Sequence, residues 1–135
     1  MKRDSRIARS FSDLEVYQLS RLLAWRVFKL SKSFPRAEMY SLTDQVRRSS
    51  RSIGGQIAEA WAKRKYSKHF LSKLTDADAG QMETVYWIGI APSCGYLEEQ
   101  AASELIDEAI KIGRMLNSMM KKSSEFCENS KHSKI

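Results

Sequence analysis

Hydrophobic residues recur at spacings of three and four positions in four stretches of the chain, as expected of amphipathic helices. No stretch alternates apolar and polar residues as a half-buried strand would. In chain order, the four apolar stripes are Val16, Leu19, Leu23, Val27 and Leu30; Leu42, Val46, Ile53, Ile57, Ala60 and Trp61; Phe70, Leu74, Ala77, Gln81, Val85 and Ile88; and Leu105, Ala109, Ile112, Leu116 and Met119. The pattern predicts an all-α, antiparallel up-down-up-down four-helix bundle over residues 11–121.

Capping and turn residues set the expected boundaries of the helices. Ser12 and Glu15 have the spacing of a capping box, with Phe11 and Val16 as a hydrophobic staple, and they predict a first helix from residue 13. The other signals are Phe34-Pro35 as its end, Ser41 and Ser67 near the starts of the second and third helices, and a Pro- and Gly-containing turn at 91–96. The fourth helix is expected from about residue 98 to about residue 121.

The ends of the chain are polar and aperiodic. Residues 1–10 are therefore predicted to be a flexible basic arm. Residues 122–135 are predicted to be a disordered tail.

The predicted second helix contains two adjacent glycines, Gly54 and Gly55. Each costs on the order of 1 kcal/mol relative to alanine inside a helix. We therefore expect either a close helix crossing or a local kink at this point.

The predicted first helix carries more apolar surface than one bundle core can cover. Leu14, Tyr17, Trp25 and Phe28 fall on a second arc, with Trp25 nearly opposite the core stripe at about 100° per residue. These side chains either cover the other helices or form a subunit interface. Because large apolar patches are uncommon on monomers, the pattern favours a subunit interface.

The formal net charge of +7 is unevenly distributed. Residues 36–73 carry nine basic and three acidic residues, a net +6, whereas residues 76–120 carry two basic and eight acidic residues, a net −6. Such polarity attracts a polyanion or pairs subunits of opposite local charge. The candidate phosphate contacts are Arg47, Arg48 and Arg51 on the outer side of the second helix and Lys63, Arg64 and Lys65 at its far end. The alternative is a solvated helix face, partly neutralised where Asp44 precedes Arg48 by four positions.

No catalytic or metal-binding constellation is visible in the sequence. Glu-x-x-His, which carboxylate-bridged metal sites in bundles require, does not occur, and no nucleophile elbow or phosphate loop is present. Glu59 and Glu83 are expected to be helix-surface groups or structural partners of Arg or Gln side chains. Cys94 and Cys127 are expected to be free thiols. No apolar run suits a membrane span or a signal peptide, so we expect a cytoplasmic protein. Because no catalytic or metal-binding constellation is visible, we expect no catalysis, metal or cofactor.

A family resemblance rests on one block of the sequence above all. The block begins with Phe34-Pro35-x-x-Glu38-x-Tyr40-x-Leu42-x-x-Gln45-x-Arg47-Arg48-x-x-x-Ser52-Ile53 and continues with Ile57-Ala58-Glu59. An earlier segment, Phe11-x-Asp13-Leu14-x-Val16, belongs to the same pattern. Together these resemble the four-helix-bundle proteins encoded in intervening sequences of bacterial 23S ribosomal RNA genes. Gly54-Gly55-Gln56 departs from the Pro-x-Asn that the family usually shows before Ile-Ala-Glu.

The resemblance implies an up-down bundle, assembly into a ring-like homopentamer and a role suspected to involve nucleic acid. A related branch comprises the accessory proteins of diversity-generating retroelements, which work with a reverse transcriptase and RNA. From charge and resemblance together we expect a homo-oligomer that binds the backbone of RNA or DNA through its basic helix face. The alternative is a structural scaffold without a nucleic-acid ligand, whose basic face meets acidic residues 98–108 of a neighbouring copy.

Overall fold

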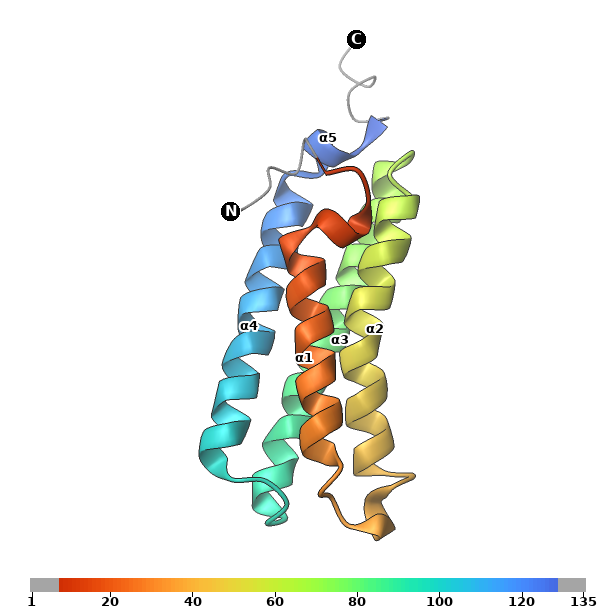
Figure 1. Ribbon diagram of the computed structural model, residues 1–135. Coiled ribbons are helices and arrows are strands. Elements are labelled where there is room, and N and C mark those ends of the chain that lie inside the picture. The colour runs from red at the N-terminus through yellow and green to blue at the C-terminus, as the bar shows by residue number, and fades with distance from the viewer. Residues whose placement is uncertain (1–7, 129–135) are drawn as a thin grey trace.

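The computed structural model describes residues 8–128, and in this range it contains helices and no strand. Four long helices make up the molecule (Figure 1): α1 (Glu15–Ser31), α2 (Leu42–Ala62), α3 (Ser67–Ser93) and α4 (Glu99–Lys121). The shorter elements are the 3₁₀ helices η2 (Phe11–Asp13) and η3 (Arg36–Glu38) and the single-turn helix α5 (Ser123–Phe126).

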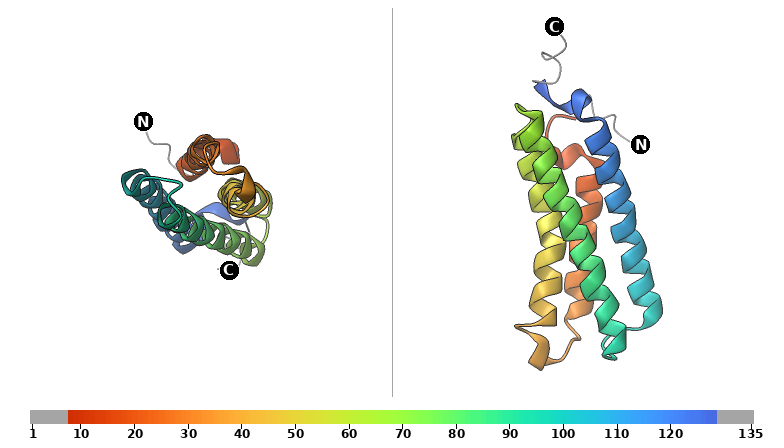
Figure 2. Two further views of the ribbon diagram at one scale, coloured as in Figure 1. Left: turned by 90° about the horizontal axis from the view of Figure 1, so that it is seen from below. Right: turned by 180° about the vertical axis from the view of Figure 1, so that it is seen from behind.

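The four helices form an antiparallel bundle in which each helix lies beside the next one in sequence (Figure 2). α4 returns to lie beside α1 and closes the ring of four, so the predicted up-down-up-down fold is confirmed. The contact between α2 and α3 is the most extensive of the four, and that between α1 and α4 is the smallest.

The core consists largely of the predicted stripes. Its largest fully buried apolar side chains are Leu23, Ile53, Ile57, Phe70, Leu74, Ile112 and Leu116. Four members of the predicted stripes, Leu19, Leu30, Trp61 and Val85, are only partly buried and pack against the edge of the core. The period of the apolar residues therefore located the core of each helix correctly.

The boundaries of α1 differ from the prediction at both ends. Ser10, rather than Ser12, is the capping residue: its hydroxyl accepts from the Ser12 N–H at 3.3 Å and opens η2, and α1 begins only after Leu14. Leu14 is extended and its side chain turns into the core, which interrupts the helix. α1 ends at Ser31, three residues before Phe34, because the Lys32 N–H bonds to carbonyls in a tightened last turn.

The predicted disordered tail is wrong for residues 122–128. Phe126 of α5 stacks on Phe70 of α3 with ring centroids 5.6 Å apart, and Cys127 is fully buried. The Glu128 N–H also donates to the Arg64 carbonyl at 3.1 Å and fastens this segment to the turn after α2. The remainder of the predicted tail, 129–135, and residues 1–7 of the predicted arm lie outside the described residues; at residue 8 the chain already packs against the core.

The two adjacent glycines of α2 have different environments. A Cβ added at Gly54 would lie 3.2 Å from the Ser20 hydroxyl and 3.4 Å from the Tyr17 ring, so α1 and α2 approach closely here, as one of the two predicted alternatives requires. A Cβ added at Gly55 would meet nothing within 4 Å. Packing within the bundle therefore explains Gly54 and not Gly55.

Glu38 ties together the two connections at one end of the bundle. Its carboxylate accepts hydrogen bonds from the Ser41 hydroxyl at 2.8 Å, the Leu42 N–H at 3.3 Å and the Tyr96 hydroxyl at 2.9 Å. The bonds from Ser41, then Tyr96 and Leu42, hold the pKa of Glu38 below its ordinary value. The hydrogen bond that Tyr96 donates to Glu38 also raises the pKa of the Tyr96 hydroxyl.

We expect Glu38 to make the protein more stable above pH 5 than below pH 4. A carboxyl whose pKa is lower in the folded state contributes stability above its unfolded pKa of about 4.3, and loses it as pH falls through the folded value. The urea midpoint of Glu38→Gln should therefore fall less than that of the wild type between about pH 5 and pH 3. Tyr96→Phe, which keeps two of the three bonds, should lie between them, and parallel pH profiles for all three proteins would contradict this role for Glu38.

Candidate nucleic-acid interface

A surface that combines aromatic and basic side chains lies where α1 and α2 run side by side. We call it the basic-aromatic face and define it by Trp25, Phe28, Lys29, Lys32, Arg47 and Arg51. The rings of Trp25 and Phe28 are stacked, with centroids 6.0 Å apart and planes inclined by 27°. Trp25 is 54% exposed, whereas Phe28 is partly buried.

Four cations surround these two rings. The Arg47 and Arg51 guanidinium carbons lie 4.8 and 5.5 Å from the Phe28 centroid, and the Lys32 ammonium lies 4.8 Å from it. The Lys29 ammonium lies 5.8 Å from the centroid of Trp25. At these distances the ring quadrupoles attract the cations and hold them close to one another.

Arg47 also crosses to α1 through a hydrogen bond. Its Nε donates to the Ser31 hydroxyl at 2.8 Å, and that hydroxyl donates to the Phe28 carbonyl. Arg47 is therefore half-buried between the helices, whereas the sequence placed it with Arg48 and Arg51 on the outer side of α2. The physical reason is the ring of Phe28, which offers Arg47 a stacking partner that the helical period of α2 alone does not reveal.

The positive charge of this face is largely uncompensated. Arg48, in the next row of α2, lies 3.8 Å from Asp44, so the predicted local neutralisation is present. Among the residues that the structure describes, none of the four cations of the basic-aromatic face has a carboxylate within 4.0 Å. These charges are therefore available to an anionic ligand.

The other predicted cluster, Lys63, Arg64 and Lys65, lies apart from this face. It follows Arg51 by 12 or more residues, about 18 Å along a helix axis. The Arg64 guanidinium stacks 3.5 Å from the centroid of its own Trp61, its Nε donates to the Trp61 carbonyl at 2.8 Å, and burial lowers its pKa. The six predicted nucleic-acid contacts thus divide between two places, and Arg64 has a structural role.

The four side chains of the predicted subunit interface are also divided. Leu14 is only 7% exposed and belongs to the core of its own bundle, so its place in that prediction is wrong. Tyr17 packs edge to face on Phe11 with centroids 4.9 Å apart, and cations cover Phe28. Trp25 alone of the four is largely exposed, and its ring stacks on Phe28, the ring that the arginines of α2 approach.

Lys29 and Lys32 are members of the face that sequence reasoning missed. They follow Trp25 and Phe28 by four positions each, the spacing that places helical side chains next to one another. That spacing was available in the sequence. What the sequence lacked was the contact of Phe28 with α2, which joins two sets of residues that had been assigned separate roles.

A shallow groove of about 260 Å³ continues from this face along the α1–α2 contact. Arg21 and Arg51 are its charged residues, and the small residues that line it are Ser20, Ala24, Ser50, Gly54, Gly55 and Ala58. Gly55 borders this groove, which accounts for the open space where its side chain would be. Arg51 belongs to both surfaces and joins the groove to the basic-aromatic face.

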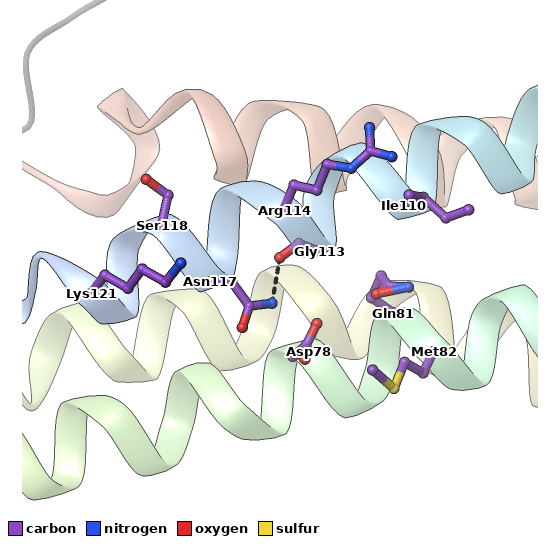
Figure 3. Close-up of a pocket in the computed structure, with 9 residues that line it drawn as sticks. All are labelled: Asp78, Gln81, Met82, Ile110, Gly113, Arg114, Asn117, Ser118 and Lys121. Carbon is purple, nitrogen blue, oxygen red and sulfur yellow. Dashed lines mark hydrogen bonds between the residues drawn. The ribbon is translucent and has the colours of Figure 1, made fainter.

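A second groove, of about 560 Å³, lies between α3 and α4 (Figure 3). Asp78, Gln81 and Met82 line it from α3, and α4 contributes Arg114 and Asn117, whose amide donates to the Gly113 carbonyl at 2.8 Å. A Cβ at Gly113 would lie 2.5 Å from the Gln81 amide oxygen, so the glycine makes room for this buried amide. The charged groups here are of both signs, which distinguishes this groove from the basic-aromatic face.

The acidic and cysteine side chains that were candidates for chemistry do not form a metal site in the described residues. Glu59 pairs with Lys73 across α2 and α3 at 3.2 Å, and Glu83 accepts from the Trp87 indole at 3.0 Å, so both have structural partners, although these are Lys and Trp rather than the expected Arg or Gln. Cys94 and Cys127 are free thiols. Within residues 8–128, no three His, Cys, Asp or Glu side chains are grouped to hold a metal ion, and no helix is long and apolar enough to cross a membrane.

Fold and site together define a small antiparallel four-helix bundle with an uncompensated basic-aromatic surface on one pair of helices. Residues 12–118 match the family described as 23S rRNA-intervening sequence protein. The match spans most of the chain, which therefore belongs to this family and confirms the resemblance found in the sequence.

A solved structure gives the same fold. It is a protein of unknown function from the S23 ribosomal protein family of Bacteroides thetaiotaomicron, 26% identical, with a TM-score of 0.72. The similarity covers 78% of this chain and 95% of that one. Among curated proteins, none matches the chain at a significant level.

Proposed function

We propose that this protein binds the sugar-phosphate backbone of nucleic acid through its basic-aromatic face, without catalysing a reaction. The observation that carries the proposal is the set of four cations, Lys29, Lys32, Arg47 and Arg51, gathered where α1 and α2 meet, with no carboxylate of residues 8–128 within 4.0 Å of them. Like charges repel when they are held together, so such a set has a free-energy cost in the free protein that a bound polyanion offsets. Phosphate contacts of this kind supply affinity without base specificity.

Salt dependence tests the proposal. Affinity for nucleic acid should fall as log salt rises, with a slope of about −0.7 to −0.9 for each phosphate contact. The combined substitution Lys29→Gln, Lys32→Gln and Arg51→Gln should flatten this slope by about 2 to 3, because up to three contacts are removed. Fluorescence anisotropy with labelled RNA and DNA measures both quantities.

A matched control removes the same charge elsewhere. Lys63→Gln, Lys65→Gln and Lys68→Gln together neutralise three cations at the other end of α2 and the start of α3, and should change the slope by less than about 1. Equal flattening by both triple variants would show that the overall field, rather than this face, attracts the ligand. Absence of binding by the wild type at about 50 mM salt, where phosphate contacts are strong, would refute the proposed function.

A protein-interaction scaffold is the second candidate function. α4 and the residue before it carry five carboxylates between residues 98 and 108, and one of them, Glu108, already pairs with Arg26 of α1. In an assembly, the carboxylates of α4 in one copy would pair with the cations of the basic-aromatic face in another. The resemblance also implies a homopentamer and a reverse-transcriptase partner, and both stay predictions. Light scattering at several salt concentrations measures the oligomeric state.

A further inference from the structure

We infer that the basic-aromatic face selects unpaired strands of nucleic acid, with one base stacked on Trp25 and the adjacent phosphates held by Lys29, Lys32 and Arg51. The inference rests on the proposed function and adds to it the class of ligand. A surface that only attracts phosphates binds duplex and single strands alike. An exposed aromatic ring among the cations adds a contact that only an unpaired base can make, because the bases of a duplex are already stacked on each other.

Trp25, rather than Phe28, is the stacking platform. Three cations crowd the ring of Phe28 within 5.5 Å of its centroid, which leaves no room for a base. Among the cations of residues 8–128, Lys29 alone lies near the Trp25 indole, 5.8 Å from its ring centroid, and the side chain of Trp25 is more than half exposed. Phe28 therefore supports the indole from one side and gathers the cations, and the indole offers its free surface to the ligand.

The spacing of the cations suits a strand that continues past the stacked base. Lys29 and Lys32 follow Trp25 by four and seven residues, about 6 and 10 Å along the helix axis. Arg51 approaches the neighbouring Phe28 ring from α2, so phosphates on either side of the helix pair come within reach of a positive side chain. Arg47, held by Ser31, contributes its charge from a fixed position.

A second copy of the chain is a poorer occupant for Trp25. A symmetric contact places the same surface of two copies face to face, and here it would bring eight cations together without a carboxylate among them. An acidic partner surface avoids this repulsion but leaves the half-exposed indole without an apolar counterpart. A nucleotide satisfies both requirements at once, because it carries a π face and a phosphate.

The test compares Trp25→Leu with Tyr86→Leu as a matched control. Tyr86 is 60% exposed and lies on α3, the helix diagonal to α1 (Figure 2). The probes are a labelled uridine homopolymer of about 20 nucleotides, longer than the 4 to 16 that one binding domain commonly covers, and an RNA duplex of the same length. Anisotropy at about 50 mM salt gives the affinities, and light scattering gives the mass of each variant.

We expect the wild type to prefer the single strand and Trp25→Leu to weaken that affinity about tenfold, which corresponds to about 1.4 kcal/mol, within the range for one stacked base. Its duplex affinity and its salt slope should not change, since no phosphate contact is removed, and Tyr86→Leu should match the wild type. Equal affinity for both probes, an equal loss on both, no loss at all, or an altered mass of Trp25→Leu would overturn the inference. A wild type that binds neither probe would instead refute the proposed function itself.

Discussion

Replacing Phe70 by alanine is expected to lower the free energy of unfolding by about 3–5 kcal/mol, a large part of the 5–15 kcal/mol typical of a domain. The side chain is fully buried near the start of α3, where it belongs to the core and stacks on Phe126 of α5. Its removal takes away a whole ring and leaves a cavity that the surrounding helices cannot fill without moving. Urea denaturation followed by circular dichroism measures the loss.

Phe126→Ala provides the matched comparison for this prediction. It removes the other ring of the stacked pair. Phe126 is 8% exposed, however, and its helix has only four residues. Because α5 packs chiefly on α3, its release leaves the four-helix core closed, and we expect a loss of less than about half that of Phe70→Ala. Equal losses would mean that α5 is as integral to the fold as the long helices.

Gly80→Leu is expected to cost about 3 kcal/mol or more through overpacking between α2 and α3. A Cβ at this position would lie 2.7 Å from the Ser52 hydroxyl, which donates to the Ser49 carbonyl, and 3.5 Å from that same carbonyl oxygen. The first added carbon already requires the Ser52 hydroxyl to move, and leucine would add three further carbons at the same site. The two helices with the most extensive contact in the bundle would have to separate.

Gly89→Leu is the control in the same helix. A Cβ at Gly89 meets nothing within 4 Å, so here the substitution adds helix propensity of up to about 1 kcal/mol without a clash. The two variants share their chemistry and their helix, and the difference between their urea midpoints therefore isolates packing. A Gly80→Leu protein as stable as Gly89→Leu would show that α2 and α3 can separate there without cost.

The sequence predicted the bundle well because each of its signals is local. Leu105, Ala109, Ile112 and Leu116 recur at helical spacing and are all buried, and α4 begins within one residue of its expected start. The prediction failed at the chain ends, where burial depends on distant partners. Phe126 lies in a largely polar segment, and its order follows from contacts with Phe70 and with the turn after α2. Leu14 was misplaced for the same reason, since its burial follows from the turn that η2 makes.

The candidate site was predicted in parts but not as a whole. The basic residues of α2 and the aromatic residues of α1 were each identified, the first as a phosphate contact and the second as a subunit interface. Which side of α2 faces α1 cannot be deduced from either helix alone, because it depends on how the two are rotated about their axes. The ring of Phe28 beneath Arg47 and Arg51 shows that rotation, and it joins the two sets into one surface.

α1 is the long helix with the least extensive contacts in the bundle. α1 makes the two smallest of the four interhelical contacts, with α2 and with α4, so the least costly partial unfolding of the core lifts this helix away from the other three. A nucleic-acid strand bound across Trp25 of α1 and Arg51 of α2, as we propose, would bind only the closed form and would therefore hold the helix in place. Ligand concentration would then set the lifetime of α1 in the bundle, and the same contacts that recognise the ligand would protect the protein from local opening.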